Sequence, residues 1–431
     1  MNAAQAVAYI HGAQYTGAKN GLENTRALLT QLKIPMTPVP AIHVAGTNGK
    51  GSVCAMLDSM LRACGLKVGL YTSPFLQFYN ERIRINGAPV SDEILAVAVT
   101  RVKEAADSLS DQGIRPTAFE LGTATAFLIF LEVEVDIAVV EVGLGGRLDP
   151  TNVITPLVSV ITALGMDHME YLGDTLEKIA GEKAGIIKPG VPTVLYPARQ
   201  EAEAVVRAAC EQKQACLMAL RHRQAVFHQA DAHGSHADFD LPKGKMEDVR
   251  IPLPGLHQVE NALTALTVMD LLGGFPVSRE AMRQGMERVC WPARLEWIGK
   301  SPRVLLDGAH NPQGVEALRS FADLFLHKEK RVLLTGVLRE KLNGKMLEDM
   351  VALSDQAVTV TPDNHRAMPA TELAALLQEE GCAAEAALGL EEGLRRAREL
   401  AGPDGIIIAA GSLYLAGSLR DLLGLQDESL S

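Results

Sequence analysis

The chain has 431 residues, 47% of them hydrophobic, and a formal net charge of −11 at pH 7. This length exceeds what one compact core usually supports, so we expect two domains. The negative charge argues against non-specific binding to nucleic acid. No apolar run approaches the ~20 residues that cross a bilayer, and the N-terminus lacks the basic flank and long apolar core of a signal peptide.

The six cysteines include no C-x-x-C pair. Cys54 and Cys64 fall on a predicted helix, where small apolar residues are expected. This cysteine usage is typical of a reduced protein, and we expect a cytoplasmic location without a membrane partner.

Helical and strand-like segments alternate along the first two thirds of the chain. Residues 1–33 have the amphipathic pattern of helix, and the apolar run at Ile42 and Val44 suits a buried strand. The expected helices are 52–64, 91–108, 118–132 and 175–186, and the expected strands are 67–72, 137–142, 157–163 and 192–196. Continuous apolar strands are typical of a sheet covered on both faces. The pattern predicts a doubly wound, mostly parallel α/β sheet.

Residues 45–52 read Ala-Gly-Thr-Asn-Gly-Lys-Gly-Ser and lie between a predicted strand and a predicted helix. Small residues let backbone N–H groups approach phosphate, and a helix N-terminus adds positive potential. Lys50 would reach the terminal phosphates of ATP, and Ser52 offers a hydroxyl to Mg²⁺. The match to G-x-x-x-x-G-K-[ST] is imperfect, because Val44 holds the first glycine position and Gly51 separates Lys50 from Ser52. An ordinary turn at Asn48-Gly49 is the alternative.

Glu141 ends the predicted strand 137–142 and precedes the glycine-rich run Gly143-Leu-Gly-Gly-Arg147. A carboxylate at the carboxyl end of a parallel strand is placed to bind Mg²⁺ beside a phosphate loop. The alternative is an ion pair between Glu141 and Arg147. The glycines favour a loop that faces a ligand.

Two further polar groups are ambiguous on sequence alone. His168 follows another strand in Gly165-Met166-Asp167-His168, where it is equally consistent with a ligand and with a structural role. Lys183 lies in a charged helical segment, and the residues alone favour a solvated helix face.

Residues 215–250 contain His222, His228, His233 and His236 among glycine, serine and aspartate. Their spacing fits no standard set of metal ligands, which favours a hairpin or an exposed loop over a metal site. A helix is expected from about Glu260.

A second strand–helix series begins near residue 303, with strands expected at Arg303–Leu306 and at 331–336, 357–360 and 405–410. We expect a P-loop ligase-type domain over residues 1–297 and a smaller Rossmann-like α/β domain over 298–431. Asn311 and Pro312 suit the cap and first turn of a helix. Asp307 and His310 would then face the crevice at the edge of the sheet.

These motifs, in this order, resemble those of the folylpolyglutamate synthase/dihydrofolate synthase family within the Mur-ligase superfamily. The resemblance covers nearly the whole chain. GTNGK alone fits any Mur-type ligase, whereas GTNGKGS with TSP, NERI and EVGLGGRLD is far more specific to the folate branch. The phosphate loop begins near residue 46, so we expect no N-terminal UDP-binding domain. The motifs are Tyr9-Ile10-His11, 46–52, 71–74, 80–83, 141–149, Asp167-His168, 182–185, His257-Gln258 with Asn261, Arg294, 307–312 and 411–414.

The resemblance implies roles for particular residues. ATP would be bound by Gly49, Lys50, Gly51, Ser52, Asn261, Arg294, Asp307 and His310, which approach it from both sides of a cleft. Two Mg²⁺ ions would be held by Ser52, Ser73, Glu141, His168 and a carbamylated Lys183. The pterin side would be lined by Thr117, Ala118, Phe119, Glu120, Leu148, Asp149 and Pro150. Lys50, Lys183 and His168 would be catalytic.

The implied reaction is ATP-dependent formation of an amide. L-Glutamate would be added through an acyl phosphate to tetrahydrofolate or folylpolyglutamate, and also to dihydropteroate. The family tendency is a monomer with small-molecule substrates. Two alternatives stay open: a Mur-type ligase acting on another carboxylate, and a P-loop nucleotide-dependent binding or switch protein without ligase chemistry.

Overall fold

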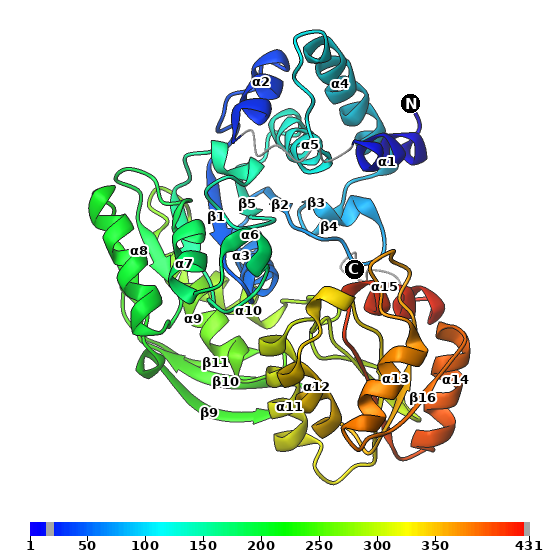
Figure 1. Ribbon diagram of the computed structural model, residues 1–431. Helices are drawn as coiled ribbons and strands as arrows, with labels where there is room; N and C mark the ends of the chain where they lie inside the picture. Colours follow the sequence, from blue (N-terminus) through cyan, green and yellow to red (C-terminus); the bar gives the residue numbers. More distant parts are fainter. Residues whose placement is uncertain (14–20, 426–431) are drawn as a thin grey trace.

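A computed structural model describes residues 1–13 and 21–425. Figure 1 shows two α/β domains, the second coloured yellow to red at the lower right. The first is built on an eight-stranded sheet with strand order β4-β3-β2-β5-β1-β6-β7-β8. All strands from β2 to β8 in that order run parallel, and β3 and β4 add an antiparallel edge. The strands are β1 (Ala41–Ala45), β2 (Val68–Tyr71), β3 (Ile83–Ile85), β4 (Ala88–Pro89), β5 (Ile137–Glu141), β6 (Val158–Ile161), β7 (Thr193–Leu195) and β8 (Leu217–Ala219).

Helices cover both faces of this sheet, which confirms the prediction of a doubly wound, mostly parallel architecture. One face packs against α1, α2, α4 and α5, and the other against α3, α9 and α10. The helices are α1 (Ala3–Gly12), α2 (Glu23–Gln31), α3 (Lys50–Ala63), α4 (Asp92–Ser110), α5 (Ala118–Glu132), α6 (Met169–Leu172), α7 (Leu176–Ala184), α8 (Gln200–Gln212), α9 (His257–Leu271) and α10 (Arg279–Glu287), with short 3-10 turns η1 (Tyr79–Arg82), η2 (Pro150–Val153) and η3 (His222–Gln224).

The central strands are buried on both faces of the sheet, and most of their side chains are apolar. Every residue of β1 and of β5 is buried, as the continuous apolar runs predict. The helix expected over 1–33 is two helices, α1 and α2, and its residues 14–20 lie outside the described part of the chain.

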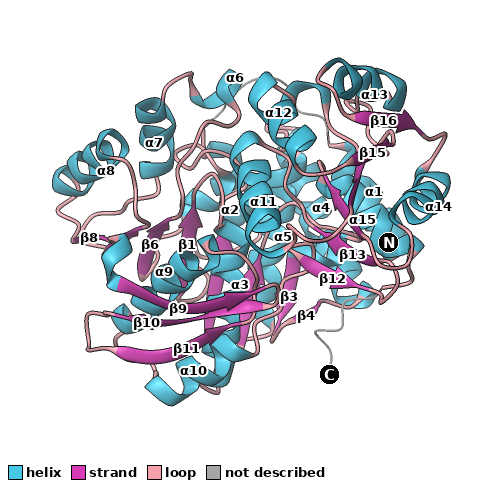
Figure 2. Cartoon of the chain, turned by 90° about the horizontal axis from the view of Figure 1, so that it is seen from below, coloured by secondary structure: helices cyan, strands magenta, loops and turns pink. Residues whose placement is uncertain are grey.

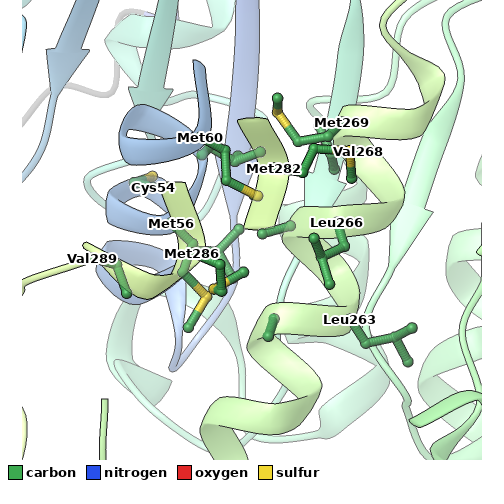
Figure 3. Packing of buried hydrophobic residues seen from close by; sticks show 14 of the residues in the cluster. Cys54, Met56, Met60, Leu263, Leu266, Val268, Met269, Met282, Met286 and Val289 are labelled. Carbon is green, nitrogen blue, oxygen red and sulfur yellow. The ribbon is translucent and has the colours of Figure 1, made fainter. Parts of the chain in front are cut away.

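Helix α3 carries the phosphate loop at its start, and a methionine-rich core fixes it in place. Figure 3 shows Met56 and Met60 of α3 facing Met282 and Met286 of α10, with Met269 of α9 beside them. All five side chains are buried. Flexible thioether side chains fill irregular gaps well, so α9 and α10 can pack closely against α3.

Residues 225–251 form a three-stranded antiparallel sheet rather than a single hairpin or a loop. Figure 2 shows it along one side of the molecule, next to α9 and α10. His228 pairs with Asp238, and His236 pairs with Asp248. The strands are β9 (Ala225–Asp231), β10 (Gly234–Phe239) and β11 (Met246–Ile251).

The second domain has a six-stranded sheet with order β12-β13-β17-β14-β15-β16, parallel except for β12. This is the smaller Rossmann-like domain that the sequence predicts. A boundary at residue 297 stays a prediction, and β12 already begins at Glu296. The elements are β12 (Glu296–Ile298), β13 (Arg303–Leu306), α11 (Pro312–Phe325), β14 (Arg331–Thr335), η4 (Arg339–Lys341), α12 (Gly344–Ala352), β15 (Gln356–Thr359), α13 (Ala370–Glu379), β16 (Ala383–Ala386), α14 (Leu390–Ala401), β17 (Ile406–Ala410) and α15 (Leu413–Leu422).

Among the described residues, no helix combines the length and the apolar character that a membrane span requires.

Candidate active site in the cleft between the domains

A cavity of about 340 Å³ opens between the two domains. Its first-domain wall comes from the phosphate loop, the loops after β2, β5 and β6, and helix α7. Its second-domain wall comes from residues 294–295 and 307–314 and from Leu413. All residues that the sequence assigns to ATP and Mg²⁺ line this one cavity, namely Gly49, Lys50, Gly51, Ser52, Ser73, Glu141, His168, Lys183, Asn261, Arg294, Asp307 and His310.

The phosphate loop wraps around the amine of its own lysine. Lys50 Nζ donates to the carbonyl oxygens of Gly46 and Thr47, at 3.1 and 3.2 Å. Gly49 precedes the first residue of α3 with φ +82°, a conformation that glycine adopts without strain. A β-carbon there would lie 2.5 Å from Asn261 Oδ1, so glycine also leaves room for α9. Gly49 therefore lets α9 pack closely against the loop, in addition to forming the turn.

Ser52 is connected to α9 by a short chain of buried amides. Gln258 Nε2 donates to Ser52 Oγ at 3.3 Å, and Asn261 Nδ2 donates to Gln258 Oε1 at 2.9 Å. Asn261 is a predicted nucleotide contact, whereas the sequence did not assign Gln258 to the site. The His257-Gln258 motif was the available signal, because it precedes Asn261 on the same helix face.

Glu141 ends β5 in the interior of the cleft, where it is 4% exposed. Its Oε2 accepts a hydrogen bond from the backbone N–H of Ser73 at 3.0 Å. Burial raises the pKa of this carboxyl, and Lys50, the Ser73 N–H and Arg294 act in the opposite direction. The alternative ion pair with Arg147 is wrong, because Arg147 pairs instead with Glu182 at 2.7 Å.

Lys183 is buried, so the solvated helix face expected from the residues alone is wrong. The side chain is 4% exposed, and its Nζ donates to the Gly46 carbonyl at 2.8 Å. Burial, with the nearby charge of Lys50, lowers the pKa of the amine to about 7. Two lysine amines therefore meet at the carbonyl of Gly46, and one of them is easily deprotonated.

Asp167 and His168 face a cation from the second domain. Lys341 Nζ donates to Asp167 Oδ1 at 2.6 Å and lies 3.2 Å from His168 Nε2. Burial alone would raise the pKa of Asp167, but His168 and Lys341 lower it to about 2. Burial lowers the pKa of His168 against the opposing charge of Asp167. His168 has φ +50°, an uncommon backbone conformation for a residue with a side chain.

The second-domain wall is organised by hydrogen bonds around Asp307. Its two carboxylate oxygens accept from the N–H groups of Leu295 and Ala309, at 2.8 and 2.7 Å. Burial raises the pKa of Asp307 against the charge of Arg294. His310 Nδ1 lies 2.8 Å from the Gly308 carbonyl, and burial lowers its pKa to about 4, so the ring is neutral at pH 7.

Asn311 caps α11 by accepting from the Gly314 N–H, with Pro312 at the first helical position, as the sequence predicts. Asn311 Nδ2 also donates to Asn48 Oδ1 at 3.0 Å. The phosphate loop therefore contacts the second domain directly.

The residues assigned to the pterin side lie next to the cavity but do not line it. Thr117 and Glu120 form a capping box at the start of α5. Phe119 would touch a β-carbon at Gly143, and Asp149 accepts from the Gly143 and Leu144 N–H groups, both at 3.0 Å. These residues support the loop after β5, and that loop does line the cavity. The remaining members of the set are Ala118, Leu148 and Pro150.

The donor set of the cleft fits Mg²⁺ bound together with a nucleotide. Serine hydroxyls and a carboxylate are hard oxygen ligands, and Mg²⁺ usually combines one or two carboxylates with substrate phosphates. The described residues contain no group of three or more His, Cys, Asp or Glu side chains placed to hold a metal ion. Mg²⁺ ions bound by Glu141 and His168 would therefore need Ser52, Ser73 and phosphate oxygens as further ligands.

Family models match both domains of the chain. The Mur ligase middle domain matches residues 44–269, and the Mur ligase glutamate ligase domain matches residues 293–413. The fold and the cleft between these two units define a Mur ligase.

Comparison with individual relatives identifies the branch of the Mur ligases. The dihydrofolate synthase/folylpolyglutamate synthase of Bacillus subtilis is 36% identical over 423 residues, covering 96% of this chain and 97% of the relative. The folylpolyglutamate synthase of Lacticaseibacillus casei is 36% identical over 432 residues, covering 98% and 99%. The chain belongs to the folylpolyglutamate synthase/dihydrofolate synthase family, which confirms the resemblance seen in its motifs.

Solved structures agree with this assignment. Mycobacterium tuberculosis folylpolyglutamate synthase complexed with ADP superposes with a TM-score of 0.91 at 31% identity, covering 98% of each chain. Escherichia coli FolC in complex with DHPP and ADP gives a TM-score of 0.88 at 29% identity, again covering 98% of each chain.

Proposed function

We propose that this protein is an ATP-dependent ligase that joins L-glutamate to the carboxylate of tetrahydrofolate, a folylpolyglutamate or dihydropteroate. The observation that carries the proposal is the meeting of Lys50, Glu141 and Lys183 in the cleft that both domains line. Relatives over the whole chain are named for these two activities, and two solved relatives hold ADP.

The nucleotide would lie across the cleft. Gly49, Lys50, Gly51 and Ser52 would hold its phosphates at the start of α3, where backbone N–H groups and the helix dipole favour anions. Asn261, Arg294, Asp307 and His310 would contact the rest of the nucleotide. Because Asp307 and His310 belong to the second domain, ATP binding would draw the two domains together.

The reaction would proceed in two displacements. The acceptor carboxylate oxygen bonds to the γ-phosphorus while the bond to the β-phosphate oxygen breaks, giving ADP and an acyl phosphate. The glutamate nitrogen then attacks the acyl carbon, loses a proton, and inorganic phosphate leaves. Lys50 would stabilise the charge on the transferring phosphoryl group. A closed cleft would exclude the water that would otherwise hydrolyse the acyl phosphate.

Ser52, Ser73, Glu141 and His168 would hold two Mg²⁺ ions together with the phosphates. When bound, Mg²⁺ supplies positive charge to the phosphate oxygens. Lys183 would join the set as a carbamate. Its lowered pKa of about 7 favours the neutral amine, which attacks CO₂, forms an N–C bond and releases a proton. The product has two oxygens and a negative charge in place of an ammonium.

The acceptor would enter beside the loop after β5, with the pterin side near Phe119, Asp149 and Pro150. We further propose a monomer that acts in the cytoplasm. The lack of a C-x-x-C pair among six cysteines supports a reducing compartment.

Release of ADP from Mg-ATP and L-glutamate, with dihydropteroate or tetrahydrofolate in separate tubes, tests the proposal. Release with both acceptors means a bifunctional enzyme, and release with tetrahydrofolate alone means polyglutamylation only. Slow hydrolysis that neither acceptor changes would favour the switch alternative.

Lys50→Ala tests the phosphate assignment in the same assay. We expect turnover to fall by about 10²–10³-fold, because a preorganised positive group at the developing charge is lost. The control is Lys245→Ala, which removes an exposed amine in the three-stranded sheet. Normal turnover by Lys50→Ala would contradict the assignment.

A further inference from the structure

One loop of the first domain joins the cavity to the second domain. This bridging loop (residues 73–78) follows β2 and begins with Ser73 and Pro74, which line the cavity. The Ser73 N–H donates to Glu141 at 3.0 Å. Only three residues further on, Leu76 and Gln77 contact α15 of the second domain.

Gln77 makes three hydrogen bonds to the second domain. Its Oε1 accepts from Arg420 Nε at 2.8 Å, and its Nε2 donates to Asp421 Oδ1 at 2.8 Å and to the Leu425 carbonyl at 3.0 Å. Arg420 is itself 3% exposed and also donates to Glu296. Both polar atoms of the Gln77 side-chain amide are therefore hydrogen-bonded to the second domain.

The backbone next to Gln77 is packed as closely as its side chain. Leu76 lies against the buried cluster of the second domain that contains Leu415 and Leu419. A β-carbon added at Gly417 would lie 1.9 Å from the Leu76 carbonyl oxygen. The loop therefore fits α15 only because residue 417 is glycine.

A buried carboxylate holds the backbone of the second half of the bridging loop. Glu81 accepts from the N–H groups of Leu76, Gln77 and Phe78, at 2.8, 2.9 and 3.1 Å. Residues 76–78 are thus tied to one carboxylate, and Pro74 and Phe75 separate them from Ser73, whose N–H donates to Glu141.

We propose that Gln77 is a positioning residue. It docks the bridging loop on α15, so that the placement of the second domain sets the position of Ser73 against Glu141. The catalytic consequence rests on the proposed ligase function. Helix α15 begins at Leu413, which lines the same cavity, so both ends of this contact reach the site.

A charge exchange tests the contact without changing the size of any side chain. Gln77→Glu keeps an acceptor for Arg420 but sets a carboxylate against Asp421. The double variant Gln77→Glu/Asp421→Asn restores a donor opposite the new carboxylate. We expect kcat to fall about tenfold in Gln77→Glu, with KM for ATP changed less than about twofold, and to recover within about threefold in the double variant.

Hydrogen–deuterium exchange of the peptide covering the bridging loop supplies a readout that needs no turnover. We expect faster exchange in Gln77→Glu and wild-type exchange in the double variant, while Tm shifts by less than about 2 °C. Unchanged exchange in Gln77→Glu, or faster exchange that Asp421→Asn does not reverse, overturns the proposal. A wild-type protein without ligase activity contradicts the proposed function instead, and the exchange result still decides the docking.

Gly417→Ala provides a second route to the same contact. The added methyl group must displace the Leu76 carbonyl, so we expect the same loss of kcat and the same faster exchange. Gly344→Ala is the matched control, because nothing lies within 4 Å of a β-carbon at that position in the same domain. Equal behaviour of the two alanine variants would also overturn the proposal.

Discussion

Lys183 is the residue whose chemistry depends most on its surroundings. Its amine is buried and is hydrogen-bonded to the Gly46 carbonyl. It also lies close enough to Lys50 for the charge of that residue to lower its pKa. Both burial and the neighbouring cation disfavour a second ammonium, which lowers the pKa to about 7. The amine is therefore about half neutral at pH 7, and the neutral form is the nucleophilic one.

A dependence on bicarbonate and pH follows from this pKa. A group of pKa about 7 is neutral for about a quarter of molecules at pH 6.5 and about nine tenths at pH 8. Only the neutral amine attacks CO₂, so at fixed dissolved CO₂ the carbamate forms more fully as pH rises. We expect protein depleted of CO₂ to regain ligase activity on adding bicarbonate, at an initial rate that, for equal dissolved CO₂, is about fourfold higher at pH 8 than at pH 6.5.

The measurement is ADP release at both pH values, before and after bicarbonate, alongside ¹³C NMR of protein labelled with ¹³CO₂. Lys183→Ala is the control and should show neither the carbamate signal nor the gain. Full activity of depleted protein, with no ¹³C signal after labelling, would rule out the modification.

Candidate site residues that lie in short sequence motifs could be predicted from the sequence. Residues that lie outside such motifs could not. Glu141 and His310 stand beside glycines or at strand ends, where the pattern itself points to a ligand. Lys341 and Gln77 have no such local signal, because their partners lie far away in the chain. Lys341, for example, contacts Asp167, which is 174 positions earlier.

At the scale of elements, the loop after β5 and helix α7 meet through two glycines. A β-carbon at Gly146 would lie 2.7 Å from the Glu182 carbonyl, and one at Gly185 would lie 2.3 Å from Arg147 Cβ. Close backbone packing is thus one reason for glycine in this loop, in addition to any approach by a ligand. It also holds Lys183, on α7, near Glu141, which ends β5 just before this loop.

Gly185→Ala should therefore destabilise the first domain by about 1–3 kcal/mol, the usual effect of overpacking. Gly181→Ala is a matched control in the same helix, because the nearest atom to its β-carbon would be 3.9 Å away. That change should instead stabilise α7 by about 0.5–1 kcal/mol, since alanine is the better helix former. Urea denaturation of both variants measures the difference. Equal urea midpoints for the two variants would show that α7 shifts to accommodate the methyl group added at residue 185.

The central elements of the fold follow from hydrophobic pattern, and the peripheral ones do not. Strands β1 and β5 are continuous, mostly apolar runs, and such runs can be recognised in the sequence. Strands β8 and β12 have three residues each, none of them fully buried, so they leave no pattern to detect. The third strand of the sheet β9–β11 was not predicted, because two adjacent acidic residues in Met-Glu-Asp-Val-Arg-Ile interrupt the polar–apolar alternation that marks a strand.

The whole molecule depends on how its two domains meet, since each domain supplies only part of the cleft. Two groups of these contacts adjoin the cleft. One is the bridging loop against α15. The other joins Asn48 and Asp167 of the first domain to Asn311 and Lys341 of the second. The second group adjoins the phosphate loop, so Asn48, Asp167 and Asn311, which line the cavity, also take part in the contact between the domains.

Lys341 carries the only positive charge among the groups named in this second contact, and its side chain and that of Asp167 are each 11% exposed. Removing one partner of a shielded ion pair leaves the other charge without compensation. In Lys341→Met, Asp167 would regain solvation only if the cleft opens. We therefore expect the nucleotide-free variant to adopt a wider average opening, with a radius of gyration about 1 Å above the ~22 Å of a compact chain of this length.

Small-angle X-ray scattering of wild type and variant, with and without Mg-ADP, measures this opening. Nucleotide bound to both walls should close the variant again, because the free energy of binding both domains favours the closed form. Lys345→Met is the control, since its amine is 54% exposed and pairs only within α12. Identical scattering from Lys341→Met and wild type would mean that the bridging loop and the packing around it hold the two domains together without the ion pair.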